Sequence, residues 1–212
     1  MNAKRQRWCL KRDPWCGLRR AAALLVLMAL MRFAPGLAQA QNLTYSEVKL
    51  GVLAHDVHIF GGKEHGVDAN PEVIFPSPIS DAWAQSQPDF IRFALQPRPT
   101  LGAEFNTSKY TNQYYFGSTW AWRLLSDVLK PDDGITFSIF FGPGFNDGDI
   151  RTSAPDRKSL GSNVLFREAV EVGYLINPVY QVSFFVDHVS NAGLARENQS
   201  INDMGARFGI RF

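Results

Sequence analysis

The sequence is poor in cysteine, and both of its cysteines, Cys9 and Cys16, lie near the start of the chain. No cysteine follows Cys16. A fold built from the rest of the chain therefore gains no stability from disulfide bonds. The 212 residues allow one domain of ordinary size, which must be held together in another way.

No apolar run in the chain is long enough to cross a bilayer as a helix. The run Ala21–Met31 follows a basic segment and precedes Arg32 and the triplet Ala38–Ala40. This order of basic, apolar and small residues predicts a secretory signal peptide over residues 1–40, cleaved after Ala40. The alternative is a retained anchor, for which a run of 11 residues is too short. Residues 41–212 would then form the mature domain.

Positive charge is also scarce beyond residue 40. Eight of the 22 Lys and Arg residues lie in residues 1–40, against the one acid Asp13. Residues 41–212 therefore carry 14 basic and 19 acidic groups, a net charge of about −5. This excess of acids excludes electrostatic attraction to nucleic acid as the basis of function, so we expect no nucleic-acid partner.

Helical periodicity is not sustained anywhere after residue 40. Apolar and polar residues instead alternate in segments of about ten residues, a pattern typical of strands in a membrane β-barrel. An even number of strands suits closure, so the sequence predicts an all-β fold, an eight-stranded antiparallel transmembrane β-barrel. The predicted strands lie near residues 46–57, 71–75, 101–106, 113–123, 135–141, 164–174, 181–190 and 203–212.

Alternation alone would also fit a soluble periplasmic β-protein. The distribution of side chains favours the barrel, because large aromatics gather on one face of the strands and arginines and acids on the other. A lipid-facing wall around a polar lumen requires this arrangement. The last predicted strand also ends in Phe212, as outer-membrane barrels commonly do.

Loop lengths predict which end of the barrel faces outward, because periplasmic turns are short and external loops are longer. The tight turn Ile176–Pro178 is therefore predicted to be periplasmic, and the segments 55–69, 146–162 and 192–201 to be external. Residues 77–98 are long for a periplasmic turn. Their part Asp89–Leu95 is compatible with either an added helix or an added strand.

A pair of polar residues continues the apolar face of the seventh predicted strand. Parity from Val182, Phe184 and Val186 places His188 and Ser190 on the lipid-facing side. Two residues apart on one face, their Cα atoms lie roughly 7 Å apart, so the imidazole can reach the hydroxyl. Serine needs such a base because its hydroxyl is a weak nucleophile at neutral pH. The alternative is that the strand has left the hydrocarbon here, where polar groups cost little.

Three stretches resemble one known family. Asp187–Leu194, with its core His-x-Ser-Asn-Ala, and the closing strand Gly205–Phe212 resemble the lipid A 3-O-deacylase (PagL) family. The stretch Gly161–Glu168 is similar to that family and to its acyloxyacyl hydrolase relatives. The resemblance covers the C-terminal third of the chain in sequence, and the remainder by length and number of strands.

The resemblance implies an eight-stranded barrel whose exterior site removes a 3-hydroxyacyl chain from lipid A. In this reading Ser190 is the nucleophile and His188 the general base. The amide groups from Asn191 to Gly193 would form the oxyanion hole.

The chain departs from the family's pattern at the third member of the site. The family has an acid twelve residues after the serine, where this chain has Asn202, and the adjacent Asp203 has lumen parity. An acid orients the imidazole and stabilises its charged form, whereas asparagine supplies no countercharge. This departure concerns activity rather than the fold.

Glu168 interrupts the lipid face of the sixth predicted strand. Pairing about the turn at Asn177 would place residue 166 opposite 188 and make Glu168 a diagonal neighbour of His188, roughly 7–8 Å away between Cα atoms. We therefore hypothesise that Glu168 replaces the missing acid, with Glu197 as a second candidate.

These features predict an outer-membrane serine esterase that removes a 3-hydroxyacyl chain from lipid A. Its partner would be lipopolysaccharide in the outer leaflet, and a homodimer is left open. No cofactor is expected. His55, His58, Glu64 and His65 share one loop and could bind a metal, but solvated loop histidines are the better explanation, so no metal is expected. The alternative is a non-catalytic small barrel with a structural or surface-interaction role.

Overall fold

The computed structural model describes residues 39–40, 45–57, 61–88, 91 and 94–212. Residues 39–212 form one compact unit. Apart from residues 39 and 40, the predicted signal peptide lies outside the described residues.

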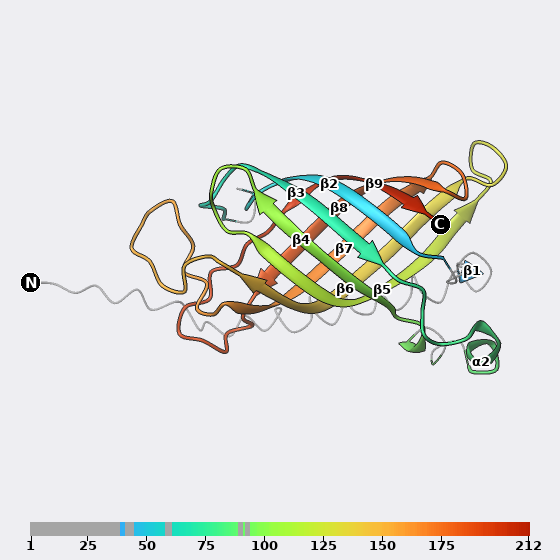
Figure 1. Cartoon of the computed structure of the whole chain (residues 1–212), viewed down its shortest axis with the longest axis horizontal. Coiled ribbons are helices and arrows are strands. Elements are labelled where there is room, and N and C mark those ends of the chain that lie inside the picture. The colour runs from blue at the N-terminus through green and yellow to red at the C-terminus, as the bar shows by residue number, and fades with distance from the viewer. Residues whose placement is uncertain (1–38, 41–44, 58–60, 89–90, 92–93) are drawn as a thin grey trace, which may run out of the picture. The chain divides into compact units, whose positions relative to one another are not determined.

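Eight antiparallel strands form a closed barrel (Figure 1). Each strand pairs with its neighbour along the chain, and β2 pairs with β9, which closes the ring. The predicted eight-stranded antiparallel barrel is therefore confirmed. The strands are β2 (Glu47–Ala54), β3 (Val67–Ile74), β4 (Arg98–Asn106), β5 (Gln113–Ser126), β6 (Gly134–Asn146), β7 (Val164–Leu175), β8 (Tyr180–Ser190) and β9 (Met204–Arg211).

Two short elements accompany the ring of eight strands. β1 (Gln39–Ala40) pairs with the end of β5. α2 (Asp81–Gln85) lies in the connection from β3 to β4, and its first turn is capped by the side chain of Ser80, which accepts a hydrogen bond from the N–H of Trp83. In the part of the chain that the structure describes, no helix is long and apolar enough to cross a membrane.

Side chains alternate between an apolar exterior and a polar lumen. Every strand of the ring exposes large apolar residues, and aromatic pairs such as Trp122 with Phe137 stack across neighbouring strands on the outside. The lumen buries charged side chains, which is tolerable because each is paired with an opposite charge. The main pairs are Arg167 with Glu104 and Asp187, Lys49 with Glu171, and Arg207 with Glu72.

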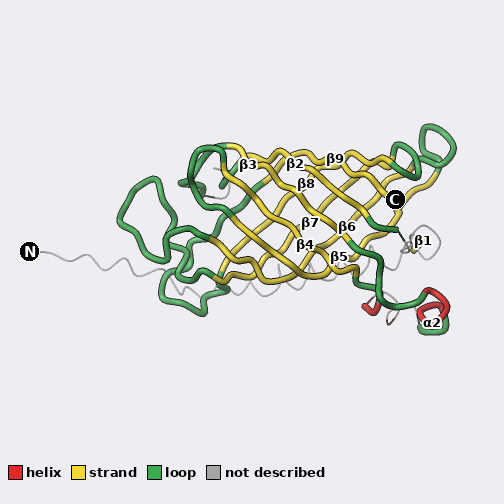
Figure 2. Tube along the Cα trace, viewed as in Figure 1, coloured by secondary structure: helices red, strands yellow, loops and turns green. Residues whose placement is uncertain are grey.

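The connections alternate between the two ends of the barrel (Figure 2). One end carries residues 55–57, 61–66, 107–112, 147–163 and 191–203, where most of each predicted external segment lies. Two predicted limits are wrong: residues 67–69 belong to β3, because β2 and β3 remain paired up to Val67 opposite Ala54, and Asn146 is the last residue of β6.

The opposite end carries residues 75–97, 127–133 and 176–179. The segment 77–98, which the sequence left open, contains α2, and the described residues Ile91, Ala94 and Leu95 are helical. Of the two alternatives for 89–95, the described residues therefore fit the helix.

The turn between β7 and β8 is longer than predicted. Ile176 N–H donates to the carbonyl of Tyr180, and the side-chain oxygen of Asn177 accepts from the N–H groups of Val179 and Tyr180. These bonds close a turn over residues 176–179, so the centre of the hairpin lies one residue later than the sequence analysis placed it.

This shift corrects the register of β7 against β8 by two residues. The structure pairs Glu168 with His188 and Phe166 with Ser190, rather than residue 166 with residue 188. A shift by two keeps every side chain on its predicted face. Glu168 is therefore a direct neighbour of His188 across the strands, rather than a diagonal one.

Candidate active site

Two polar side chains end β8 on its exterior face. His188 and Ser190 are half-buried there, whereas the alternating residues Asp187 and Val189 are buried toward the lumen. The pair lies at the end of the barrel that carries the long connections. Strand alternation alone thus gives both side chains the same orientation.

His188 contacts one polar partner with each ring nitrogen. Its Nε2 lies 3.1 Å from Ser190 Oγ, and its Nδ1 lies 2.7 Å from Asn202 Oδ1. An amide oxygen can only accept, so Nδ1 must carry the ring proton and Nε2 is left with a free lone pair toward the serine hydroxyl. This tautomer is the one that a general base for serine requires.

Asn202 is held in place by the backbone on both sides of it. Ile201 and Val189 exchange two backbone hydrogen bonds of 2.9 and 3.1 Å, and Asp187 N–H donates to the carbonyl of Asp203. The connection thus continues the pairing with β8 before β9 begins. The carbonyl of Asn202 accepts from Val57 N–H at 2.8 Å, which ties it to the connection after β2.

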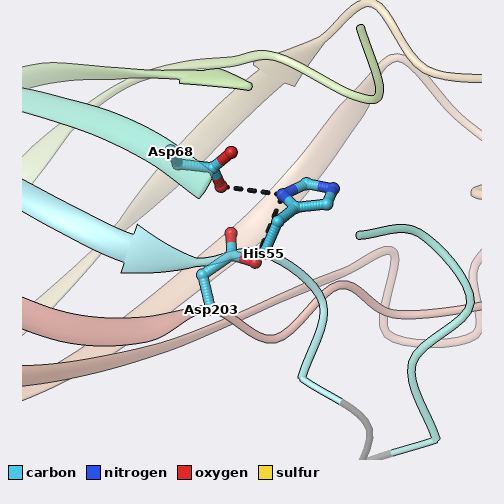
Figure 3. A group of neighbouring side chains, drawn as sticks. All are labelled: His55, Asp68 and Asp203. Carbon is cyan, nitrogen blue, oxygen red and sulfur yellow. Dashed lines mark hydrogen bonds and ion pairs between the residues drawn. The ribbon is translucent and has the colours of Figure 1, made fainter. Parts of the chain in front are cut away.

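A buried histidine with acidic partners lies on the lumen side, next to this segment (Figure 3). His55 Nδ1 lies 2.7 Å from Asp68 and 3.4 Å from Asp203, and Nε2 lies 3.2 Å from Glu64. The predicted solvation is wrong for His55, which is buried with both ring nitrogens bonded to acids. The next two residues, Asp56 and Val57, are hydrogen-bonded to residues 203 and 202, which holds this part of the chain against the barrel. His65 is exposed as predicted, and residue 58 lies outside the described residues.

The charge state of this cluster follows from its hydrogen bonds. Burial lowers the pKa of His55, but the bonds to Asp68 and Glu64 and the charge of Asp203 outweigh it and raise the pKa to about 11. Burial likewise raises the pKa of Glu64, but the bonds from His55 and from the N–H groups of Lys158 and Thr111 lower it to about 2. His55 is therefore a buried cation at neutral pH.

The same cluster has the ligand types of a metal site. One ligand atom from each of His55, Asp68 and Asp203 lies within 4.8 Å of the others, and Glu104, Asp187 and Asp203 form a similar group. A histidine must be neutral to bind a metal, so a metal at this cluster would have to displace the proton that Asp68 and Glu64 hold on His55.

Asn191, predicted as part of the oxyanion hole, fastens neighbouring loops. Its side-chain N–H groups donate to the carbonyls of Leu160 and Glu197, and its backbone N–H donates to Asn198 Oδ1. Its own Oδ1 accepts from Gly193 N–H at 2.9 Å. The amide N–H groups of Asn191 and Gly193 are thus engaged within the loop.

Ala192, between them, was not singled out by the sequence analysis. Its φ is +54°, in the left-handed region that residues with a Cβ seldom adopt. Its N–H has no acceptor in the described part of the chain. Such strain is common at functional sites, and only the backbone geometry could reveal it, since the sequence has an ordinary alanine there.

Neither of the two acids proposed as substitutes for the third member bonds a ring nitrogen of His188. Glu168 is exposed on the exterior face opposite His188, and neither ring nitrogen bonds it. Glu197 lies 3.9 Å from Arg151 in the loops. Asn202 itself therefore occupies the orienting position.

Apolar side chains flank the hydroxyl of Ser190 on the exterior. Phe166 lies opposite Ser190 on β7 and stacks on Phe141 of β6 with ring centroids 6.4 Å apart. Val164 and Phe145 continue this exposed apolar surface. A hydrocarbon chain lying along these strands would meet apolar side chains next to the hydroxyl.

The family model for lipid A 3-O-deacylase (PagL) matches residues 92–211 of this chain. No curated protein matches the sequence. Among solved structures, the outer membrane enzyme PagL shares 16% sequence identity and a TM-score of 0.55, over 77% of this chain and 98% of that one.

Two other barrels are similar at lower scores. The N-terminal β-barrel domain of Pseudomonas aeruginosa OprF has 7% identity and a TM-score of 0.44, over 81% of this chain and 98% of that one. Neisserial surface protein A has 11% identity and a TM-score of 0.46, over 79% and 96%. The likeness to solved structures shows the fold alone. The family model spans more than half of the sequence, and this chain therefore belongs to the lipid A 3-O-deacylase (PagL) family.

Proposed function

We propose that this protein, a lipid A 3-O-deacylase-like outer-membrane barrel, is a serine esterase that removes a 3-hydroxyacyl chain from lipid A. One observation carries the proposal. Ser190 Oγ lies 3.1 Å from Nε2 of His188, on the exterior face of the barrel and beside an apolar surface. Neither a cofactor nor a metal is needed for this chemistry.

In the first half of the reaction, Ser190 Oγ attacks the carbonyl carbon of the ester while its proton passes to His188 Nε2. The tetrahedral intermediate carries its negative charge on the former carbonyl oxygen. When it collapses, the bond to the sugar oxygen breaks, and Nε2 returns the proton to that oxygen. The products are the sugar alcohol and an acyl-serine at Ser190.

In the second half, a water molecule replaces the sugar alcohol. His188 Nε2 takes a proton from the water as its oxygen attacks the acyl-serine carbonyl, and it then returns a proton to Ser190 Oγ. The 3-hydroxy fatty acid leaves and the free enzyme is restored.

We assign stabilisation of the negative oxygen to the loop from Asn191 to Gly193. Backbone N–H groups are suitable donors for such an oxyanion. Ala192 N–H is the donor without an acceptor in the described loop, and Gly193 N–H could join it by exchanging its bond to Asn191 Oδ1. The hydrogen bonds of the Asn191 side chain would hold these donors in place.

Orientation and export belong to the same proposal. Long connections of outer-membrane barrels face outward, which would put Ser190 at the level of the outer leaflet, where lipid A lies. Residues 1–40 would be removed as a signal peptide during export, leaving residues 41–212 in the membrane.

The proposal is tested by mass spectrometry of lipid A from cells that express this chain and whose lipid A bears a 3-hydroxyacyl group at position 3. We expect a product lighter by that one chain, and no product with Ser190→Ala. Ser126→Ala, at the opposite end of the barrel, is the matched control and should behave as wild type. Heat-modifiable gel mobility shows that each variant is folded.

A non-catalytic barrel with a structural or surface role is the second candidate, and the neutral Asn202 favours it. Replacing the acid by its amide in a soluble serine protease triad lowers the rate about ten-thousandfold, because the amide selects the wrong tautomer. Here Asn202 presents its oxygen to Nδ1, so the tautomer is correct and only the countercharge is missing. Unchanged lipid A with a folded wild-type barrel would support this second candidate.

A further inference from the structure

His188 must become positively charged during the proposed reaction, yet its partner Asn202 is neutral. We propose that Glu168 supplies the countercharge for the protonated imidazole, while Asn202 fixes its tautomer. One acid performs both tasks in a serine triad, and here the tasks are divided between two parts of the chain, the segment before β9 and the strand β7. This inference rests on the proposed function.

The register of the barrel places Glu168 next to His188. The two residues are direct partners in the antiparallel pairing of β7 with β8, and both side chains point to the exterior. The Cβ atoms of such partners lie about 4.5–5.5 Å apart. Charge can therefore act between the side chains even though neither ring nitrogen bonds Glu168.

Glu168 has no other polar partner among the described residues. Its neighbours on the exterior row of β7 are apolar and exposed, and in the described part of the chain it forms neither a hydrogen bond nor an ion pair. A charged side chain on a lipid-facing row is unfavourable by itself. The row members are Val164, Phe166, Val170 and Val172.

Other acids near His188 in sequence or space are already committed elsewhere. Asp187 points into the lumen and pairs with Arg167, and Asp203 accepts hydrogen bonds from Asp56 N–H and Gln113. Glu197 pairs with Arg151 in the loops. Among the described residues, Glu168 is therefore the acid that faces His188 on the exterior.

The size of the effect depends on the separation of the charges, for which we take the spacing of the paired Cβ atoms. Two unit charges about 5 Å apart stabilise one another enough to change a rate by about 5-fold in a water-like medium and by about 200-fold at the effective dielectric of a protein surface. The proton reaches His188 only as the ester is attacked, so this stabilisation acts on the transition state and not on substrate binding.

The first test compares Glu168→Gln with Asp149→Asn, the same change of an acid to its amide at an exposed loop residue, as the control. Both variants are tested as the purified barrel acting on lipid A in detergent micelles. We expect Glu168→Gln to lower kcat by about 5- to 200-fold with little change in KM. A purely structural role would not confine the loss to kcat.

The second test repeats Glu168→Gln in an Asn202→Asp background. The carboxylate introduced by Asn202→Asp would carry the countercharge itself, so the loss caused by Glu168→Gln should shrink at least several-fold. Equal losses in both backgrounds, or an unchanged rate in Glu168→Gln, would overturn the inference. A folded wild-type barrel that releases no fatty acid would instead overturn the proposed function, so the two failures are distinguishable.

Discussion

Asn202→Asp and Asn202→Leu together measure what the residue at position 202 contributes. Its Oδ1 accepts from His188 Nδ1 at 2.7 Å, and an aspartate oxygen in the same place would turn a neutral hydrogen bond into a charge-assisted one. Neutral bonds contribute about 0.5–1.5 kcal/mol and bonds to charged groups about 1.5–3 kcal/mol. The difference of about 1–2 kcal/mol predicts a rate about 5- to 30-fold higher for Asn202→Asp.

Asn202→Leu removes the acceptor at Nδ1 without adding a charge. The ring is then free to carry its proton on Nε2, which faces Ser190 and would no longer accept the serine proton. A wrong tautomer in a soluble triad costs about four orders of magnitude. We therefore expect a fall of about 100- to 10,000-fold, the smaller value applying if the ring still samples the productive tautomer.

The assay is the initial rate of release of 3-hydroxy fatty acid from lipid A in detergent micelles, expressed per folded barrel. If Asn202→Asp were no faster and Asn202→Leu no slower than wild type, residue 202 would not orient His188, and the reasoning above would be refuted.

The remaining predictions concern the buried cluster. His55→Gln leaves buried carboxylates without their cation and should lower the free energy of unfolding by about 3–5 kcal/mol in urea titrations. The control His65→Gln, at an exposed residue, should change it little. Equal stability of the two variants would contradict the ion-pair account. The pKa of His55 is raised from 6.5 to about 11, so its contribution to stability is complete below pH 6.5, declines above it and is lost as the pH passes about 11. Alkaline unfolding of wild type beside His55→Gln measures this, and identical pH dependence of the two would count against a charged His55.

Much of the barrel could be predicted from the sequence because strand alternation is a local property. The segment from Gln113 to Arg123 shows period two so clearly that its strand and faces need no further information, and β5 begins at Gln113 as expected. Strand ends were less accurate. β3 begins at Val67, well before the predicted Pro71, because its pairing with β2 extends further than its own apolar pattern.

The register of β7 against β8 could not be predicted to better than two residues. It depends on where the turn is centred, and the side chain of Asn177 decides this by accepting hydrogen bonds from two later N–H groups. Parity survives such a shift, so the faces of Glu168 and His188 were predicted although their pairing was not.

The candidate site was predictable where it depends on one strand and unpredictable where it depends on contacts between distant segments. The shared exterior face of His188 and Ser190 follows from the alternation of side chains along β8. Three other features depend on how the loops at this end of the barrel fold. They are the contact of Asn202 with His188 Nδ1, the left-handed backbone at Ala192 and the burial of His55. The burial of His55 could not be predicted from the sequence, because solvated loops also contain histidines and acids.

The most direct test of the central claim, that Ser190 cleaves an acyl ester of lipid A, is the mass spectrum of lipid A incubated with the purified, refolded barrel. Wild type should yield a product lighter by one 3-hydroxyacyl chain together with the free 3-hydroxy fatty acid, and Ser190→Ala should yield neither. A wild-type barrel shown to be folded that leaves lipid A intact, or a Ser190→Ala barrel that still releases the fatty acid, would contradict the account.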